Sequence, residues 1–163
     1  MGSVILKHKS GAGFTLIELI IVMAIIFVIA GAVAPIYGNL QSTTQLNETT
    51  SQAVQALRMA RERSVSRYNN ARHGVKFDLV SSPNKFILYQ GTSYASRDAE
   101  YDRETTLSQS MSIVTTGLSP VGDDINFSMG LGIPDKTGSV NINHSVEGFK
   151  VININDYGAV TEN

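Results

Sequence analysis

An uninterrupted apolar segment near the N-terminus constrains this chain more than any other feature. Between Phe14 and Ala34, 18 of the 21 residues are hydrophobic, and Glu18 is the only charged one. As an α-helix, 21 residues span roughly 31 Å, which matches the hydrocarbon core of a bilayer. The segment therefore predicts a transmembrane helix.

The charges on either side of this segment predict its orientation. Lys7 and Lys9 precede it, whereas residues 39–52 carry only Glu48. The positive-inside rule then keeps the N-terminus in the cytoplasm and exports the residues beyond about 38. A cleaved secretory signal is the alternative, since residues 30–34 are small. The apolar region of such signals spans only about 7–15 residues, however, which is shorter than this one.

Glu18 is the unusual residue of the segment. A carboxylate inside a bilayer is costly and is usually retained for a functional partner. It either reaches the headgroups or pairs with a cation in the membrane. If the chain were cut after Gly13, the new amine of Phe14 would lie one helical turn from Glu18. The amine of a neighbouring copy could reach the same carboxylate during assembly.

Residues 11–34, GAGFTLIELIIVMAIIFVIAGAVA, resemble the class III leader junction and N-terminal helix of type IV pilins and type II secretion pseudopilins. Gly13 corresponds to the residue before the cut, Phe14 to the first mature residue and Glu18 to the fifth. The resemblance implies that a prepilin peptidase removes residues 1–13 and that Phe14 is N-methylated. It also implies that Glu18 pairs with a neighbour's N-terminus at an inner-membrane assembly platform.

A second helical pattern follows the apolar segment. Pro35, which matches a proline near the membrane exit of many family members, and Gly38 are expected to break or kink the helix. Over residues 35–72 an amphipathic continuation is expected, and its apolar face comprises Leu46, Ala53, Val54, Leu57, Ala60, Ser64, Val65, Tyr68 and Ala71. Such a stripe normally packs on a domain core.

From residue 73 onward, short β-type runs alternate with turn residues. Strands are expected over residues 75–80, 85–90, 107–114, 125–128, 139–143 and 149–154, with hairpins joining the first two and the last two. The predicted fold class is α+β: a long N-terminal helix, transmembrane and then amphipathic, packed on an antiparallel β-sheet head formed by residues 73–163.

Residues 53–77, AVQALRMARERSVSRYNNARHGVKF, are similar to the helix end and first strand of H-type minor pseudopilins and FimT-type minor pilins. The segments INFSMGLG (125–132), GSVNIN (138–143) and FKVININDYGAV (149–160) also fit that pattern. Many members have Trp in an early strand, and this chain has none. Phe86 and Tyr89 are expected to fill that position.

Catalytic and metal-binding patterns are weak. The chain contains no Cys, which excludes disulfides, thiol nucleophiles and Cys-ligated zinc. We expect His73 and His144 to be solvated loop residues, and no cofactor or metal site is expected. The acidic residues of RDAEYDRE (97–104) and Asp123-Asp124 would suit calcium, but Arg97 and Arg103 interrupt the first group. A solvated acidic loop is the simpler interpretation.

Positive charge concentrates in one place despite a net charge of −1. Residues 58–72 hold five Arg and one Glu, whereas residues 73–163 carry an acidic excess. The arginines are expected to be solvated and to pair with neighbouring subunits. A DNA-binding stripe is the alternative, but phosphate contacts need a presented basic surface, so nucleic acid is not the expected partner.

Together these patterns predict a minor pseudopilin, a structural subunit of the type II secretion pseudopilus, held in the bacterial inner membrane by a single span with an exported head. Its expected partners are other pilin-like subunits. The alternative within the same fold is a minor pilin of a type IV pilus that serves adhesion, twitching or DNA uptake. An extracytoplasmic enzyme or solute-binding protein with an uncleaved anchor is the alternative from another class.

Overall fold

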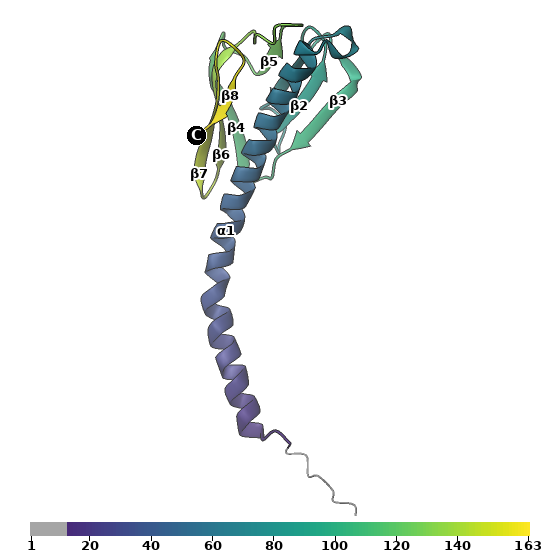
Figure 1. Cartoon of the computed structure of the whole chain (residues 1–163). Coiled ribbons are helices and arrows are strands. Elements are labelled where there is room, and N and C mark those ends of the chain that lie inside the picture. Colours follow the sequence, from purple (N-terminus) through teal and green to yellow (C-terminus); the bar gives the residue numbers. More distant parts are fainter. Residues whose placement is uncertain (1–12) are drawn as a thin grey trace, which may run out of the picture. The chain divides into compact units, whose positions relative to one another are not determined.

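The computed structural model describes residues 13–163, except for the side chains of residues 32–39 (Figure 1). One α-helix, α1 (Leu16–Val65), is followed by a 3-10 turn, η1 (Tyr68–Asn70), and by strands that extend to the C-terminus. The chain forms two compact units, Met1–Gly38 and Asn39–Asn163. The second of these, called the globular unit below, contains the end of α1 and all strands of the described residues.

Residues 40–64 of α1 carry most of the apolar stripe that the sequence periodicity predicts, whereas Val65 and Tyr68, which were expected on the same face, are 42% and 50% exposed. Ala53, Leu57 and Ala60 have no exposed surface. Along this face the buried residues follow one another in steps of four and three: Leu46, Thr50, Ala53, Leu57, Ala60 and Ser64. That spacing keeps them on one side of a helix. Thr50 donates its hydroxyl to the Leu46 carbonyl at 2.7 Å, which satisfies a buried polar group.

The first sheet is antiparallel, with the strand order β3-β2-β1-β5. Its strands are β1 (His73–Asp78), β2 (Lys85–Gln90), β3 (Asp98–Thr106) and β5 (Asp124–Phe127). β1 and β2 form the predicted hairpin, in which Val75 lies opposite Leu88. On its other side Val75 lies opposite Ile125 of β5. This register gathers buried aliphatic side chains on one face of the sheet.

The second sheet is also antiparallel, with the order β4-β6-β7-β8. Its strands are β4 (Met111–Ser119), β6 (Thr137–His144), β7 (Gly148–Ile154) and β8 (Val160–Glu162). β6 and β7 form the second predicted hairpin, and Val140 lies opposite Ile152. Along β6 and β7, buried residues alternate with partly exposed ones, as expected for a sheet with one face on a core.

A single hydrophobic core joins α1 to both sheets. Among its fully buried members are Leu57 of α1, Phe77 of β1, Ile142 of β6 and Ile152 of β7. Figure 1 shows α1 crossing the globular unit between β2 and β3 on one side and the β6–β7 hairpin on the other. The predicted α+β class, with a helix packed on antiparallel strands, is therefore confirmed, and the strands form two sheets.

Two strands depart from the sequence prediction. β3 was not expected, because the charged run RDAEYDRE lacks the apolar alternation of a buried strand. β3 is an edge strand, and charged side chains are common there because they discourage pairing with other chains. The strand expected over 107–114 is wrong in position, because β4 begins only at Met111. Residues 107–110 form a turn in which Met111 donates its N–H to the Ser108 carbonyl at 3.0 Å.

The α-helix ends at Val65, earlier than the expected boundary at residue 72. Arg67, Asn69 and Asn70 adopt left-handed backbone conformations, with φ values of 55°, 53° and 50°. Such a conformation cannot continue a right-handed helix. The N–H of Gly130 donates a hydrogen bond to the Ser64 carbonyl at 2.9 Å, so a loop distant in sequence pairs with one of the carbonyls left free at the end of the helix.

Candidate assembly helix and surfaces of the globular unit

The first turns of α1 expose apolar side chains around the whole helix. Exposed large hydrophobic residues in this part of the helix are Leu16, Ile17, Leu19, Ile20, Ile21, Val22, Met23, Ile25, Ile26, Phe27, Val28 and Ile29. Phe27 is 75% exposed, and Phe14, just before the helix, is 85% exposed. A helix that is apolar on every side needs an apolar cover, either a membrane or neighbouring helices. Residues 14–31, called the assembly segment below, are therefore the first candidate functional site.

Glu18 belongs to a helix cap that was not predicted from the sequence. Thr15 Oγ1 accepts the backbone N–H of Glu18 at 3.3 Å, so Thr15 caps the helix. Thr15-Leu16-Ile17-Glu18 has the spacing of a capping box, a signal that was readable in the sequence. The carboxylate lies in the first helical turn, where the helix dipole favours negative charge. Among the described residues no cation pairs with it, and its side chain is exposed.

The remaining N-terminal predictions concern residues that the structure describes only in part. Residues 1–12 of the predicted leader lie outside them, whereas Gly13 is exposed. α1 includes Pro35 and Gly38, and the helix break expected at these two residues stays a prediction.

Within the part of the chain that the structure describes, no helix meets both the length and the hydropathy required of a membrane span.

Two of the clustered arginines hold the globular unit together. Arg58 donates from Nη2 to the Val160 carbonyl of β8 at 2.9 Å. Arg61 donates from Nε to the Gly132 carbonyl at 3.3 Å and from Nη2 to the Tyr157 carbonyl at 3.1 Å. Solvated arginines were expected: Arg58 is exposed, as expected, whereas Arg61 is only partly exposed, and both side chains also bond within the chain. Their partners are backbone carbonyls far along the chain, which no local pattern reveals.

The expectation that both histidines are solvated is also wrong. His73 is only 1% exposed, and neither ring nitrogen has a well-formed hydrogen bond among the described residues. Burial, with a smaller contribution from the positive charge of Arg63, lowers the pKa of His73 below its usual value of 6.5. His144 is 7% exposed, and its Nδ1 accepts the N–H groups of Val146 and Glu147, both at 3.3 Å. Both histidines are structural.

Several of the acidic residues form ion pairs. Arg97 contacts Asp102 at 2.7 Å, Lys136 contacts Asp124 at 2.9 Å, and Asp123 pairs with Lys76. The described residues contain no group of three or more His, Cys, Asp or Glu side chains placed to hold a metal ion.

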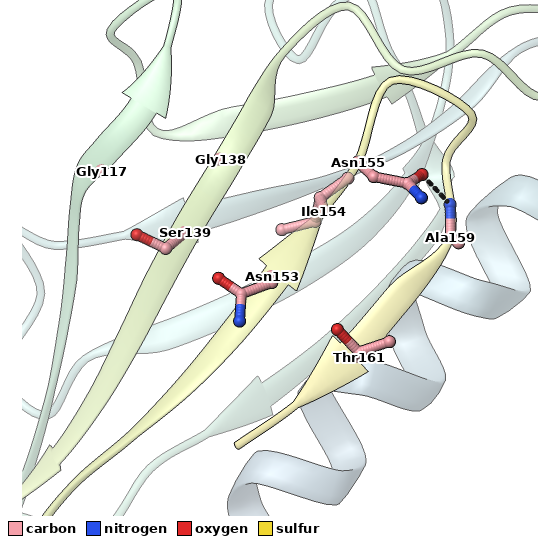
Figure 2. A pocket seen from close by; sticks show the side chains of 8 residues that line it. All are labelled: Gly117, Gly138, Ser139, Asn153, Ile154, Asn155, Ala159 and Thr161. Carbon is pink, nitrogen blue, oxygen red and sulfur yellow. Dashed lines mark hydrogen bonds between the residues drawn. The ribbon is translucent and has the colours of Figure 1, made fainter.

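A hollow of about 280 Å³ lies on the sheet β4-β6-β7-β8 (Figure 2). Ser139, Asn153 and Thr161 line it and lie side by side across β6, β7 and β8. Gly117 opens the space, because a Cβ at that position would collide with Ser139 Oγ. The lining carries no charged side chain, so the hollow has no group suited to acid–base chemistry.

Comparisons with known proteins agree with this geometry. Residues 8–34 match the model of the family described as the prokaryotic N-terminal methylation motif. In two crystal forms, the type IV minor pilin FimU of Pseudomonas aeruginosa strain PAO1 has a similar fold. One form gives a TM-score of 0.58 at 13% identity and covers 76% of this chain and 92% of that chain. The other gives 0.54 at 14% identity and covers 72% and 92%. No curated protein sequence matches the chain.

Proposed function

We propose that this chain, which is type IV pilin-like in its N-terminal motif and its fold, is a minor structural subunit of an extracytoplasmic filament. The observation that carries the proposal is the assembly segment, which is apolar on every side and begins at a matched methylation motif. A soluble protein does not leave so much apolar surface in water. The assembly segment therefore lies in the inner membrane before assembly and among neighbouring helices afterwards.

In this proposal each part of the chain has one task. Prepilin peptidase removes residues 1–13, and the new N-terminus at Phe14 is methylated. Residues 14–34 form the membrane span and later the filament core, and residues 35–72 continue into the head, with the helix breaking at Pro35 and Gly38 on assembly. Residues 73–163 are periplasmic before assembly and meet other subunits afterwards. No enzymatic step is assigned to any residue.

During assembly, the negative charge of Glu18 attracts the N-terminus of a neighbouring subunit. Its carboxylate is exposed, sits in the first turn of α1 and has no cation among the described residues. In the low dielectric of a membrane, an N-terminal amine from a neighbouring subunit is a strong partner for such a group. Pairing brings the two apolar helices together and relieves both buried charges.

Two assemblies fit this role, and an observation favours each. The pattern of residues 53–77 resembles both H-type minor pseudopilins and FimT-type minor pilins, and the first of these resemblances favours the type II secretion pseudopilus. The fold likeness to FimU favours a type IV pilus, because FimU is a type IV minor pilin. The two assemblies differ in the process that fails when the subunit is missing, which is protein secretion for the pseudopilus and piliation or DNA uptake for the type IV pilus.

Deletion of the gene, followed by quantitative mass spectrometry of the periplasm and the medium, separates these assemblies. Folded exoproteins trapped in the periplasm, with secretion restored by a plasmid copy, place the subunit in the secretion pseudopilus. Unchanged secretion with loss of surface pili or DNA uptake places it in a type IV pilus. If secretion, piliation and DNA uptake are all unchanged, the proposal of a filament subunit is refuted.

A further inference from the structure

The proposed filament role assigns no task to the hollow on the sheet β4-β6-β7-β8. Its volume of about 280 Å³ is close to the lower end of the range for small-molecule sites, which is roughly 300–1,000 Å³. Ser139 of β6, Asn153 of β7 and Thr161 of β8 line it from neighbouring strands (Figure 2). Ser139 and Asn153 alternate along their strands with the buried Val140 and Ile152, so they face away from the core. A recess in which polar groups converge is the usual form of a small-molecule site.

The polar side chains at the centre of the hollow are available to a ligand. No hydrogen bond joins these three side chains to any other residue that the structure describes. Ser139 and Asn153 are nevertheless half-buried. Asn155, at the edge of the hollow, differs from them, because its Oδ1 accepts the N–H groups of Tyr157 and Ala159 at 3.0 and 2.8 Å. Asn155 therefore holds the rim in place, whereas the central hydroxyls and amide keep their bonding capacity.

Two glycines keep the hollow open. Gly117 lies opposite Ser139, and a Cβ on Gly117 would collide with Ser139 Oγ. Gly138 has a φ of 123°, which side-chain-bearing residues rarely adopt, and a Cβ on it would collide with the Gly117 carbonyl oxygen. The recess is therefore built into the register of β4 and β6. A preformed site of this kind lowers the entropic cost of binding.

The chemistry of the lining selects the class of ligand. Among the described residues, those that line the hollow carry no charge, so they offer no counterion to a phosphate, a carboxylate or an amine. A wholly apolar ligand would cover the hydroxyls and the amide without bonding them, which is unfavourable. A peptide that extends a sheet pairs with a strand edge, whereas the hollow lies on a sheet face. A neutral ligand rich in hydroxyl groups meets all of these conditions, because hydroxyls donate and accept hydrogen bonds as the lining does.

The spacing of the groups fits an oligosaccharide. Neighbouring strands lie about 4.8 Å apart, so Ser139, Asn153 and Thr161 span about 10 Å, the length of about two sugar units. Phe149 lies on the same face of β7, about 14 Å along the strand from Asn153, and is 64% exposed. An exposed aromatic ring can stack on the apolar C–H face of a sugar. A chain of about four sugar units is long enough to reach both places.

We propose that the hollow binds a neutral oligosaccharide. Ser139, Asn153 and Thr161 exchange hydrogen bonds with two neighbouring sugar units, and the ring of Phe149 stacks on a sugar farther along the same chain. The inference adds a ligand to the head and does not depend on which filament the chain joins.

Nuclear magnetic resonance titration of the purified full chain tests this binding. The chain is kept in dodecylphosphocholine micelles, because a detergent with a sugar headgroup would compete for the hollow. The probes are maltotetraose, cellotetraose and chitotetraose, and the controls are tetragalacturonate, which is charged, and an N-acetylated tetra-alanine amide, which is a neutral peptide. We expect a neutral saccharide, but neither control, to give saturable shifts of the amides of residues 138–140, 153–155 and 159–161. No such shift with any of the three probes, or the same shifts with a control, would overturn the inference.

Single substitutions locate the binding in the hollow. Ser139→Ala and Thr161→Val each remove one hydroxyl, and Thr106→Val is the matched control, because Thr106 is also an exposed residue of an edge strand. We expect the first two to weaken binding about fivefold, as the loss of one neutral hydrogen bond does, and the control to leave it unchanged. The amide spectra show that each variant is folded. Wild-type affinity of both hollow variants would refute the assigned site.

The length of the saccharide tests the contact with Phe149. We expect the wild-type chain to bind the tetrasaccharide more tightly than the disaccharide of the same sugar, and Phe149→Ala to remove that difference. Equal affinities of the wild-type chain for the two lengths would refute the stacking on Phe149. Binding is measured on the purified chain, so its failure leaves the proposed filament role intact.

Discussion

Replacing Arg61 by Met should loosen the end of the globular unit without unfolding it. Met keeps the apolar stem of the side chain but removes the donors to Gly132 and Tyr157, at 3.3 and 3.1 Å. At these lengths and with partial exposure, each bond contributes about 1 kcal/mol, so the expected loss is about 2 kcal/mol. With a urea m-value of about 1.5 kcal/mol/M, the unfolding midpoint should fall by ~1.3 M.

The assay is urea unfolding of the full chain in detergent, followed by near-ultraviolet circular dichroism of its tyrosines, because the chain has no Trp. Hydrogen exchange then locates the effect, and the amides of residues 130–133 and 157–159 should exchange faster. Arg63→Met is the control, since among the described residues the Arg63 side chain forms no hydrogen bond or ion pair and lies over the ring of Tyr68, at 5.5 Å from the ring centre. An Arg61→Met midpoint within about 0.3 M of the control, with unchanged exchange, would refute the bridging role.

Three further predictions concern the core, the buried histidine and the assembly segment. Leu57→Ala should cost about 3 kcal/mol, because Leu57 is fully buried in the core, and a thermal or urea unfolding curve close to wild type would contradict the packing. Because the pKa of His73 is lowered in the folded chain, the unfolded chain binds a proton at this residue first as the pH falls below 6.5. The contribution of His73 to stability should therefore be complete above pH 6.5 and decline below it. In urea midpoints measured on both sides of pH 6.5, His73→Gln should flatten that decline. Glu18→Ala should leave leader cleavage intact on immunoblots but reduce incorporation into sheared filaments, whereas normal incorporation would rule out the pairing with a neighbouring N-terminus. In the same experiment Glu18→Gln, which keeps the shape of the side chain without its charge, should behave like the Ala variant.

The sequence alone was enough for features that depend on local pattern. The assembly segment is evident because nearly every residue is apolar, so no knowledge of contacts is needed. The buried face of α1 follows from steps of three and four residues, and the hairpins β1–β2 and β6–β7 follow from short apolar runs around turns. In each case one residue and its close neighbours carry the information.

Tertiary structure alone decided the features that depend on distant partners. Arg61 bonds to carbonyls 71 and 96 residues away, and nothing near Arg61 in the chain distinguishes it from Arg63. His73 looked solvated because it follows a polar helix end, yet the first sheet and η1 bury it. β3 forms because its backbone pairs with the edge of β2, although many side chains of β3 are charged. Burial and backbone pairing across the fold outweigh local propensity, because their energies depend on elements that meet only after folding.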